Sequence, residues 1–279
     1  MSDMVRVGPG NKCPICGNIT WCLIGHSVII CMRTQSPRTV PFKGGEIGYA
    51  HPHPDPKKRK TYSQKAPRRP PQINARRLLQ EWHRTYHAEQ TRLPILASEL
   101  GVTVNSLIYL ECQAAGGWNR AWGFPMKDGF GNYIGIRIRN EWGKKWAVTG
   151  SQAGIFIPKV SLNSLRHETR MFVVEGPTDT AAGVDMGLFV VGRPSCSGGV
   201  THVCNFARNK RVTQVVLIAD NDEPGIRGAK DLQRWLKVPS CVLTLPCKDL
   251  REFIKIGDRS TIDSMVEQLA WTQPNKDNE

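Results

Sequence analysis

The sequence predicts an α/β fold: a parallel sheet flanked by helices in the C-terminal part, preceded by a small cysteine-rich module. Two apolar runs rich in β-branched residues, 171–174 and 215–219, are each followed by a stretch of helical pattern, as expected for buried strands of a parallel sheet. Acidic residues stand directly after both runs, Glu175 after the first and Asp220 and Asp222 after the second. Four of the nine cysteines cluster near the N-terminus, which predicts a metal-bound module rather than a disulfide framework.

Residues 1–45 are expected to form a zinc ribbon around one structural zinc ion. Such an ion takes four ligands in a tetrahedron, and a Cys-x-x-Cys-Gly turn supplies the first two. A cysteine at the end of a short β-type run supplies another, and the remaining position falls to Cys22 or His26. We favour Cys22 because a soft thiolate suits a structural site. The predicted zinc ligands are Cys13, Cys16, Cys22 and Cys31.

Positive charge is concentrated in the first half of the chain. The formal net charge is +14, and residues 1–150 hold 22 Lys and Arg against 9 Asp and Glu, whereas residues 151–279 hold 16 against 15. This asymmetry favours nucleic acid as a partner over a basic surface kept for solubility alone. Residues 46–74 are rich in Pro, Lys and Arg and poor in apolar residues. We expect a basic linker there, which either contacts phosphates or serves only as a spacer.

Residues 75–168 are expected to form a mixed helical and β-rich subdomain. Apolar spacing predicts an amphipathic helix over 75–90 and a second helix over 94–100. The string LASELGVTVNSL that includes the second helix resembles part of a helix-turn-helix, but a helix–Gly–helix packing unit gives the same string and is favoured. Residues 118–157 have aromatic and β-branched runs punctuated by Asp-Gly and Gly-Asn, which predicts a β-meander.

Residues 169–279 alternate between strand and helix patterns, as a parallel sheet with crossover helices requires. We expect strands near 171–174, 188–191, 214–219 and 240–245, and helices near 178–186, 225–237, 249–256 and 260–271. Ligands of open α/β sheets bind beyond the carboxyl ends of the strands. Acids projected from two strand ends would share that crevice, where their repulsion is costly unless a cation lies between them. The pattern therefore predicts a divalent-metal site for phosphoryl transfer.

We expect a cytoplasmic protein with no membrane partner. No run approaches the roughly 18 apolar residues of a membrane-spanning helix. The N-terminus lacks the apolar core of a secretory signal, and an odd number of cysteines with one tight cluster is typical of a reducing compartment.

The acidic blocks resemble a known family. Glu175-Gly-Pro-Thr-Asp179 and Asp220-Asn-Asp222-Glu-Pro-Gly are similar to the two signature blocks of the TOPRIM domain, a Rossmann-like domain of DNA primases, topoisomerases and some nucleases. The resemblance covers about residues 170–256 and includes a stretch, Lys-Asp249-Leu-Arg-Glu-Phe, that resembles the Lys-Asp segment of primases. A zinc ribbon, a basic linker, a β-rich basic segment and then TOPRIM is the domain order of bacterial and phage primases.

The resemblance implies roles for particular residues. Mg²⁺ or Mn²⁺ would be held by Asp220 and Asp222, with Asp249 as a further acid, and Glu175 would serve either as another ligand or as the base for the attacking hydroxyl. Asp179 would support Glu175, unless it is only a first-turn acid favoured by the helix dipole. Basic residues similar to those that hold nucleotide phosphates and template in phage primase-helicases are Arg137, Arg139, Lys145 and Lys248.

By this resemblance the protein would be a DNA primase that makes short RNA primers from ribonucleoside triphosphates on single-stranded DNA. The zinc ribbon would read the template. The sequence contains no G-x-x-x-x-G-K-[ST] phosphate loop, so we expect a replicative helicase to be a separate protein. The alternatives are a non-catalytic DNA-binding scaffold, similar to recombination mediators that combine a Cys₄ module with TOPRIM, and a TOPRIM nuclease.

Overall fold

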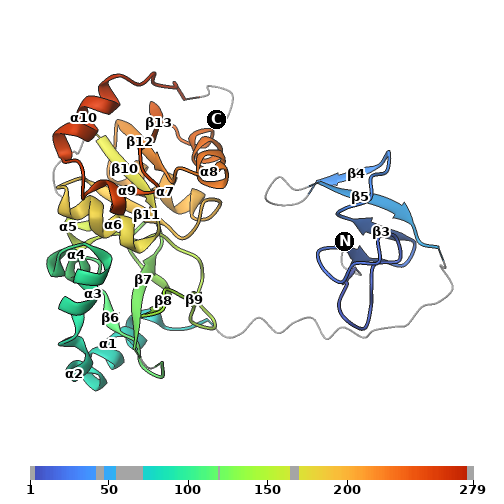
Figure 1. The fold of residues 1–279 in the computed structure, drawn as a ribbon, viewed down its shortest axis with the longest axis horizontal. Helices are drawn as coiled ribbons and strands as arrows, with labels where there is room; N and C mark the ends of the chain where they lie inside the picture. The colour runs from blue at the N-terminus through green and yellow to red at the C-terminus, as the bar shows by residue number, and fades with distance from the viewer. Residues whose placement is uncertain (1–3, 42–46, 55–71, 119, 164–169, 275–279) are drawn as a thin grey trace. The chain divides into compact units, whose positions relative to one another are not determined.

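The protein consists of two compact units, Met1–Arg68 and Arg69–Glu279. The computed structural model describes residues 4–41, 47–54, 72–118, 120–163 and 170–274 (Figure 1). No helix among these residues is long and apolar enough to cross a membrane.

The N-terminal unit is a five-stranded antiparallel sheet in the order β1-β2-β3-β5-β4. Its strands are β1 (Val5–Arg6), β2 (Leu23–Ile24), β3 (Val28–Cys31), β4 (Thr39–Pro41) and β5 (Ile47–Pro52). Strand β5 lies inside the range 46–74 that the sequence predicts as linker. It is a strand because Gly48 and Ala50 alternate inward, and it pairs with both β3 and β4. The linker was predicted from the Pro, Lys and Arg content of the whole range, and within β5 the only proline is its last residue, Pro52.

The C-terminal unit begins with four short helices and an antiparallel sheet. The helices are α1 (Ala75–Thr85), α2 (His87–Gln90), α3 (Leu93–Leu100) and α4 (Val104–Tyr109), so the helix predicted over 75–90 is interrupted at Tyr86. The predicted meander is present as β7 (Ala121–Lys127), β8 (Tyr133–Asn140) and β9 (Lys145–Ala147), with β6 (Gln113–Ala114) beside β7. Helix α1 covers one face of this sheet, where Leu79 and Trp82 pack with Ile136 and Ile138.

The helix–Gly–helix string is a packing unit, as favoured from the sequence. Gly101 ends α3 at φ 69°, a left-handed conformation that costs glycine little. Helix α4 then docks on α6 (Gly176–Asp185). Asp185 accepts hydrogen bonds from the Thr103 backbone N–H at 2.7 Å and the Ser106 hydroxyl at 3.2 Å, so the start of α4 is bound to the C-terminal half of the unit.

The C-terminal half is a four-stranded parallel sheet in the order β11-β10-β12-β13. Its strands are β10 (Arg170–Glu175), β11 (Val190–Arg193), β12 (Gln214–Ala219) and β13 (Ser240–Thr244). Helices α7 (Val200–Asn209) and α8 (Glu223–Gln233) cover one face; α6, α9 (Leu250–Phe253) and α10 (Arg259–Glu267) cover the other (Figure 1). Helix α7 is absent from the sequence prediction, and β11 begins two residues later than predicted.

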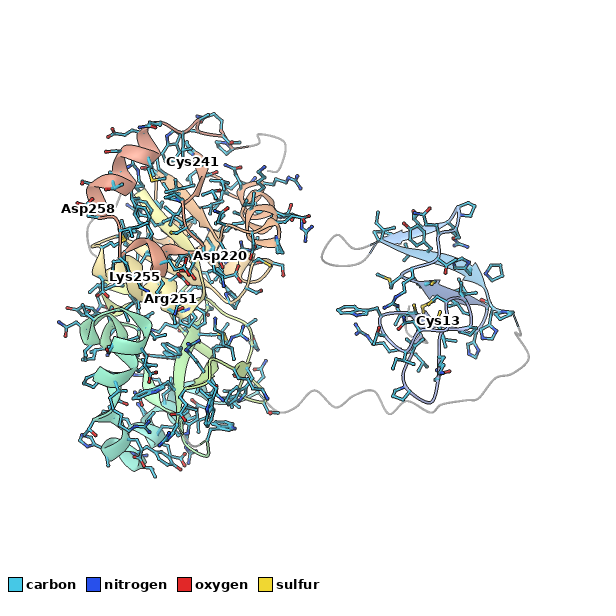
Figure 2. All side chains as sticks on the ribbon, viewed as in Figure 1. Cys13, Asp220, Cys241, Arg251, Lys255 and Asp258 are labelled. Carbon is cyan, nitrogen blue, oxygen red and sulfur yellow. The ribbon has the colours of Figure 1, made fainter. Side chains whose placement is uncertain are left out.

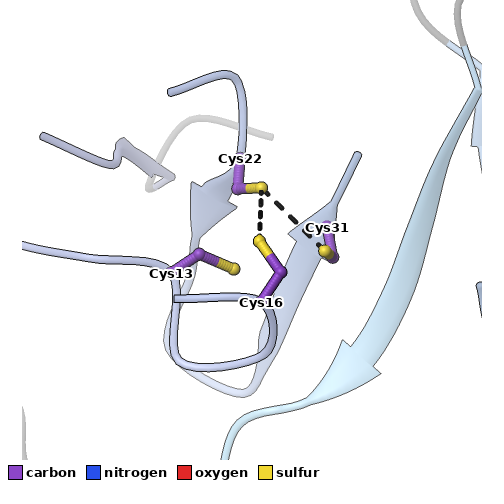
Figure 3. Close-up of side chains that lie close together, drawn as sticks. All are labelled: Cys13, Cys16, Cys22 and Cys31. Carbon is purple, nitrogen blue, oxygen red and sulfur yellow. Dashed lines mark hydrogen bonds between the residues drawn. The ribbon is translucent and has the colours of Figure 1, made fainter. Parts of the chain in front are cut away.

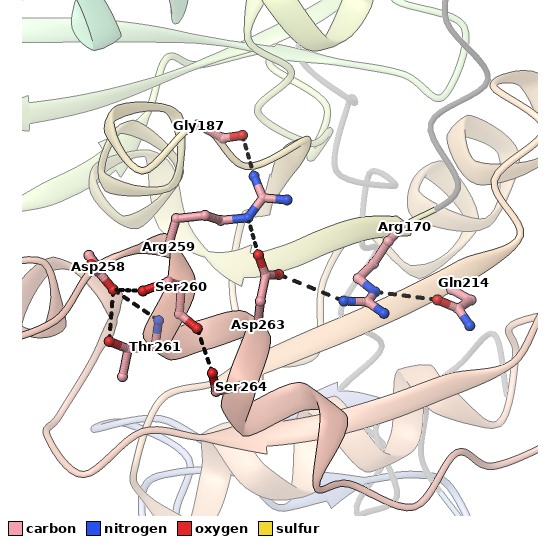
Figure 4. A network of polar contacts seen from close by, with 9 residues as sticks. All are labelled: Arg170, Gly187, Gln214, Asp258, Arg259, Ser260, Thr261, Asp263 and Ser264. Atoms are coloured by element: carbon pink, nitrogen blue, oxygen red, sulfur yellow. Dashed lines mark hydrogen bonds and ion pairs between the residues drawn. The ribbon is translucent and has the colours of Figure 1, made fainter.

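Side-chain alternation along the strands builds the two cores. On β12, Val215 and Leu217 pack under α7 and α8, whereas Val216 and Ile218 pack under α6, α9 and α10. All four are at most 5% exposed, which explains the continuous apolar run in the sequence. Helix α10 is fixed at the opposite end of the strands from the acids: Asp263 lies 2.8 Å from Arg259 Nε and 3.7 Å from Arg170 Nη1, on β10 (Figure 4).

The two sheets of the C-terminal unit are joined by one short segment. Ile155 exchanges backbone hydrogen bonds with Lys127 of β7, and Phe156 does the same with Gly192 of β11. Ile155 and Phe156 are both buried. The segment with helix α5 (Lys159–Leu162) after it therefore fixes the antiparallel sheet against the parallel one.

Candidate functional site

The four predicted cysteines form a compact group in the N-terminal unit. Their sulfur atoms all lie within 4.8 Å of one another and point toward a common centre (Figure 3). Cys22 Sγ is 3.8 Å from Cys16 Sγ and 3.9 Å from Cys31 Sγ. Tetrahedral coordination of a zinc ion by four sulfur atoms, with zinc–sulfur bonds of about 2.3 Å, places the sulfur atoms about 3.8 Å apart. Cys22 belongs to the group and His26 does not.

The surroundings of the sulfurs also fit a thiolate-bound cation. Backbone N–H groups of Arg33 and Thr34 point at Cys31 Sγ at 3.5 and 3.2 Å, and that of Met32 points at Cys22 Sγ at 3.4 Å. Burial, with the neighbouring thiols, raises the pKa of Cys22 to about 12, so the thiols cannot all ionise together unless a cation compensates their charge. The group fits a structural zinc ion, as the sequence predicts.

The predicted acids gather at the carboxyl edge of the parallel sheet. Glu175 is the last residue of β10, and Asp220 directly follows β12, the neighbouring strand (Figure 2). The helix after β10 and the helix before β12 lie on opposite faces of the sheet. Such a switch point opens the crevice in which α/β sheets bind ligands. A small cavity here is lined by Glu175, Arg193, Asp220 and Gly225 among others.

The other three acids stand in the first turn or at the N-cap of helices around this edge. Asp222 caps α8 by accepting the Gly225 N–H at 2.7 Å, and Asp249 caps α9 by accepting the Glu252 N–H at 2.9 Å. Asp179, in the first turn of α6, accepts the Arg251 N–H at 2.9 Å. Each of these carboxylates satisfies an N–H group at a helix start. Asp179 and Asp249 are buried there, whereas Asp222 is exposed.

The pKa values record how closely the acids interact. Burial first, and then the charges of Asp179, Glu175, Asp249 and Asp222, raise the pKa of Asp220 to about 7. Burial and the charge of Asp249 likewise raise the pKa of Asp179 to about 7. The pKa of Glu175 is raised by burial and by Asp222, but Arg193 and Lys145 oppose this rise. Asp220 is therefore the acid on which the repulsion of all the others converges.

The acids do not form a closed cluster like that of the cysteines. Among the described residues, the cysteines are the only group of three or more ligand atoms within 4.8 Å of one another. The carboxylates lie farther apart because they repel one another and because three of them are bound to helix N–H groups. Their chemistry fits Mg²⁺ or Mn²⁺, since these cations prefer oxygen ligands and Mg²⁺ commonly keeps several waters, using only one or two carboxylates.

The two acidic loops are held together through the main chain. Asn221, between Asp220 and Asp222, donates its N–H to the Lys248 carbonyl at 2.7 Å, and its side chain donates to the Leu245 carbonyl at 3.3 Å. The loop after β12 is thus fixed to the loop that carries Asp249. Lys248 has an exposed side chain, and its observed contacts are made by its backbone.

Basic residues of the antiparallel sheet face the acids. Arg139 on β8 pairs in register with Lys145 on β9, which places both side chains on one face of the sheet. Burial and the charge of Arg251 lower the pKa of Arg139, and Lys145 acts on Glu175 and Asp179. These cations therefore lie near the acidic edge. Arg137 is used differently: its guanidinium donates to the Pro194 carbonyl at 2.9 Å.

The arrangement matches known structures in its fold. No family model and no curated protein matches the chain. A DnaG catalytic core superposes with a TM-score of 0.56 at 16% identity, over 69% of this chain and 76% of that chain. The E. coli primase catalytic core gives 0.55 at 14% identity over 69% and 77%. The RNA polymerase domain of Mycobacterium tuberculosis primase DnaG, in complex with double-stranded DNA, gives 0.53 at 14% identity over 71% and 82%.

The C-terminal unit has the fold of a primase catalytic core. The predicted fold class is thereby confirmed: a mixed helical and antiparallel subdomain followed by a parallel sheet. At 14–16% identity the likeness to these cores concerns the fold. The roles of the acids and bases must be argued from this chain's own residues.

One residue of this primase-core fold escaped the sequence analysis. Arg193 ends β11 directly opposite Glu175 in register, and it is only 5% exposed. Its Nε donates to the Gly198 carbonyl and its Nη1 to the Gly228 carbonyl, both at 3.0 Å. Burial lowers the pKa of Arg193, and Glu175 opposes that effect. The arginine is a fixed cation beside Glu175.

Arg251 is a second missed residue. It lies on α9 (Figure 2), its backbone N–H binds Asp179, and its guanidinium is 3.8 Å from Asp249. The sequence signal was present, because Arg251 is part of the Lys-Asp stretch that resembles primases. The signal for Arg193 was absent, because one of its partners, Gly228 on α8, is distant in the sequence.

Proposed function

We propose that the protein is a DNA primase, which joins ribonucleotides on a single-stranded DNA template. The observation that carries the proposal is the convergence of the acids on Asp220 at the switch point of a primase-core fold, with cations of a second sheet facing them. A polyanionic substrate with bound divalent cations needs both kinds of charge in one place. One of the structures with a similar fold is a DnaG primase catalytic domain bound to ssDNA, which supports the choice of template.

The acids divide into two roles by their environment. Asp220 carries the repulsion of four other acids, so it has the greatest need of a cation, and we assign it with Asp222 and Asp249 to the divalent metal. The metal, when bound, neutralises charge that builds on the phosphoryl oxygens. Glu175 is already compensated by the charges of Arg193 and Lys145. It therefore has less need of a metal than Asp220, and we assign it as the proton acceptor.

The proposed reaction is a nucleotidyl transfer. The 3′-hydroxyl of one nucleotide attacks the α-phosphorus of the next, a new oxygen–phosphorus bond forms, and the bond to the β-phosphate oxygen breaks to release pyrophosphate. The hydroxyl proton passes to Glu175, whose pKa is raised above that of an ordinary glutamate and thus lies nearer the working pH. Positioning and charge stabilisation supply most of the catalysis in such transfers.

Cations near the edge would hold the phosphates. Arg139, Lys145 and Arg251 are assigned to the triphosphate and to the template backbone, because they lie next to the acids. Arg137 is assigned to support the loop after β11 through Pro194. Lys248 keeps an exposed side chain and is assigned to the entering nucleotide.

The N-terminal unit is proposed to bind the template as well. Its zinc ion would be structural, since a sheet this small has little core apart from the cysteines. Trp21 is 57% exposed, and Arg6 lies over its ring at 6.0 Å. An exposed aromatic ring beside an arginine offers a stacking surface for an unpaired base.

The test is primer synthesis by the purified full-length chain. With single-stranded DNA, four ribonucleoside triphosphates and Mg²⁺ or Mn²⁺, we expect short oligoribonucleotides on a gel. Asp220→Ala should reduce the rate of primer synthesis roughly a hundredfold or more, as expected when charge stabilisation at the reacting phosphate is lost. Its affinity for DNA should be nearly unchanged. Glu267→Gln is the matched control, because Glu267 is an exposed acid at the end of α10 and should leave synthesis intact.

Other outcomes would identify the alternatives. A nuclease would shorten the DNA under the same metals and would need no nucleotide. A scaffold of the recombination-mediator kind would bind DNA, make no product and show no metal-dependent affinity for ribonucleotides. Absence of primers on every template, with and without a replicative helicase, would overturn the proposal.

A further inference from the structure

A second cavity, separate from the acidic edge, lies where α1 and α2 meet the β6–β7 hairpin. It has a volume of about 300 Å³ and shares no lining residue with the cavity at Glu175 and Asp220. Three aromatic rings and two arginines contribute to its walls: Tyr86, Trp118, Trp122, Arg92 and Arg120. Alanines of β6 and β7 line the rest, which leaves room for a ligand. This size is at the lower end for pockets that bind small organic groups.

The ring of Trp118 is held in place and still accessible. It packs edge-on against Trp82 at 5.9 Å between centroids and against Trp146 at 6.1 Å. Trp82 is 4% exposed and belongs to the core under α1, so the contact fixes the indole of Trp118. Trp118 itself is 37% exposed. A braced indole with an open surface can stack on a flat aromatic ligand at little entropic cost.

The two arginines of the wall share one carboxylate partner, Glu141. Arg120 Nη1 is 3.1 Å from Glu141 and Arg92 Nη2 is 3.8 Å from the same carboxylate. One carboxylate cannot accept from all ten N–H donors of two guanidinium groups. The remaining guanidinium N–H groups can therefore donate to a phosphate, which guanidinium groups bind in a bidentate manner. Glu89 is the acid in the wall, and it can accept from an amino group of a base.

One wall residue of the pocket, Trp122, is in register with basic residues near the acids. Trp122 on β7 pairs with Arg139 on β8, which pairs with Lys145 on β9. Directly paired side chains lie on one face of a sheet. Trp122, Arg139 and Lys145 thus form a row across one face of the sheet, whereas Trp118 packs with Trp82 and Trp146 on the face that α1 covers.

We infer that this pocket binds an unstacked base of single-stranded nucleic acid, with the adjoining phosphate on Arg120. Aromatic platforms combined with a cationic track are the features by which proteins hold single strands without regard to sequence. An apolar metabolite would not need the two arginines, and a phosphate alone would not need the three rings. The inference shares the single-stranded DNA partner with the proposed function but requires no catalysis.

Affinity for a labelled oligothymidylate, measured by fluorescence anisotropy, tests the inference. Trp118→Ala should weaken binding roughly tenfold, since base stacking on an aromatic residue contributes about that much, and Trp118→Phe should restore most of it. Trp235→Ala is the matched control, because Trp235 is 62% exposed and lies outside the pocket. Melting temperatures of the variants show whether each remains folded.

The salt dependence of DNA binding distinguishes the contribution of Arg120 from that of Trp118. Arg120→Gln should reduce the slope of log affinity against log salt by about 0.7, the value for one phosphate contact on a single strand, whereas Trp118→Phe should leave the slope unchanged. If Trp118→Ala and Arg120→Gln both bind as tightly as the wild type, or if Trp235→Ala weakens binding equally, the inference is wrong.

Photocrosslinking locates the base directly. A single strand carrying 5-iodouracil should form an adduct on the peptide that contains Trp118, and the adduct should persist in Asp220→Ala. It should also persist with excess ribonucleoside triphosphates. Adducts only elsewhere, or loss of the Trp118 adduct to competing free nucleotide, would overturn the inference. Because the Asp220→Ala protein is used, this result does not depend on primer synthesis.

Discussion

Replacing Asp220 by asparagine should stabilise the protein while abolishing primer synthesis. The pKa of Asp220 rises from an ordinary 3.8 to about 7 because of burial and four acidic neighbours. At about 1.36 kcal/mol for each tenfold change in proton affinity, ionising this carboxyl in the fold costs at most about 4 kcal/mol. The side chain is partly exposed, so solvent screening reduces this to about 2 kcal/mol.

The pH dependence has a definite sign. Between pH 3.8 and about 7 the folded protein holds the Asp220 proton more tightly than the unfolded chain does, so stability falls as the pH rises through this window. The amide of the Asp220→Asn variant does not titrate. At about pH 8 the free energy of unfolding of the variant should therefore exceed that of the wild type by about 2 kcal/mol. For a unit of this size this corresponds to a melting temperature about 4–8 °C higher. The difference should disappear below about pH 4.

Thermal denaturation followed by circular dichroism, without added divalent cation, measures this difference. Millimolar Mg²⁺ should then raise the melting temperature of the wild type, because a bound ion stabilises the folded state, and should raise that of Asp220→Asn less. An Asp220→Asn protein that melts no higher than the wild type at alkaline pH would refute the argument that the acids repel one another. A pH-independent difference would refute it as well.

Three further predictions rest on other parts of the chain. Metal analysis should find one zinc ion per chain. The zinc should be lost in Cys22→Ser and retained in His26→Ala. If Cys22→Ser retains the zinc, the ligands are not the four cysteines. In Arg193→Met the pKa of Glu175 should rise further, since a buried cation is removed, and the acidic limb of the pH–rate profile should move to higher pH. Arg193→Lys keeps the charge and should restore most of the profile; a profile that Arg193→Met leaves unmoved would contradict this role. Asp185→Ala should lower stability by about 1–3 kcal/mol, seen as a drop of several degrees in melting temperature, and an unchanged melting temperature would mean that the contact between α4 and α6 is not stabilising.

The parts of the fold that the sequence predicts are those with a strong local pattern. Strands β10 and β12 are apolar runs buried on both faces, and the acids at their ends follow from their position. Helix α7 was not predicted, although its buried residues Val203, Phe206 and Ala207 have helical spacing. Strand β5 was missed because its buried Gly48 and Ala50 are small, and its pairing with β3 is not visible in local composition.

The candidate site was predictable as far as chain position decides it. Glu175 and Asp220 come together because both end parallel strands that are neighbours, which follows from topology. The bonds that orient the acids could not be predicted: Asp179 binds the backbone of Arg251, 72 residues away, and Arg193 binds the carbonyl of Gly228 on α8. Long-range polar contacts of this kind leave no periodic signal in a sequence.

Anomalous diffraction from crystals soaked in MnCl₂ tests the central claim most directly. The account predicts a manganese peak within bonding distance, about 2.2 Å, of an Asp220 oxygen, with Asp222, Asp249 or Glu175 completing the protein ligands, and a separate zinc peak among the four cysteines. A zinc peak alone, with the acids directed apart and no density between them, would contradict it.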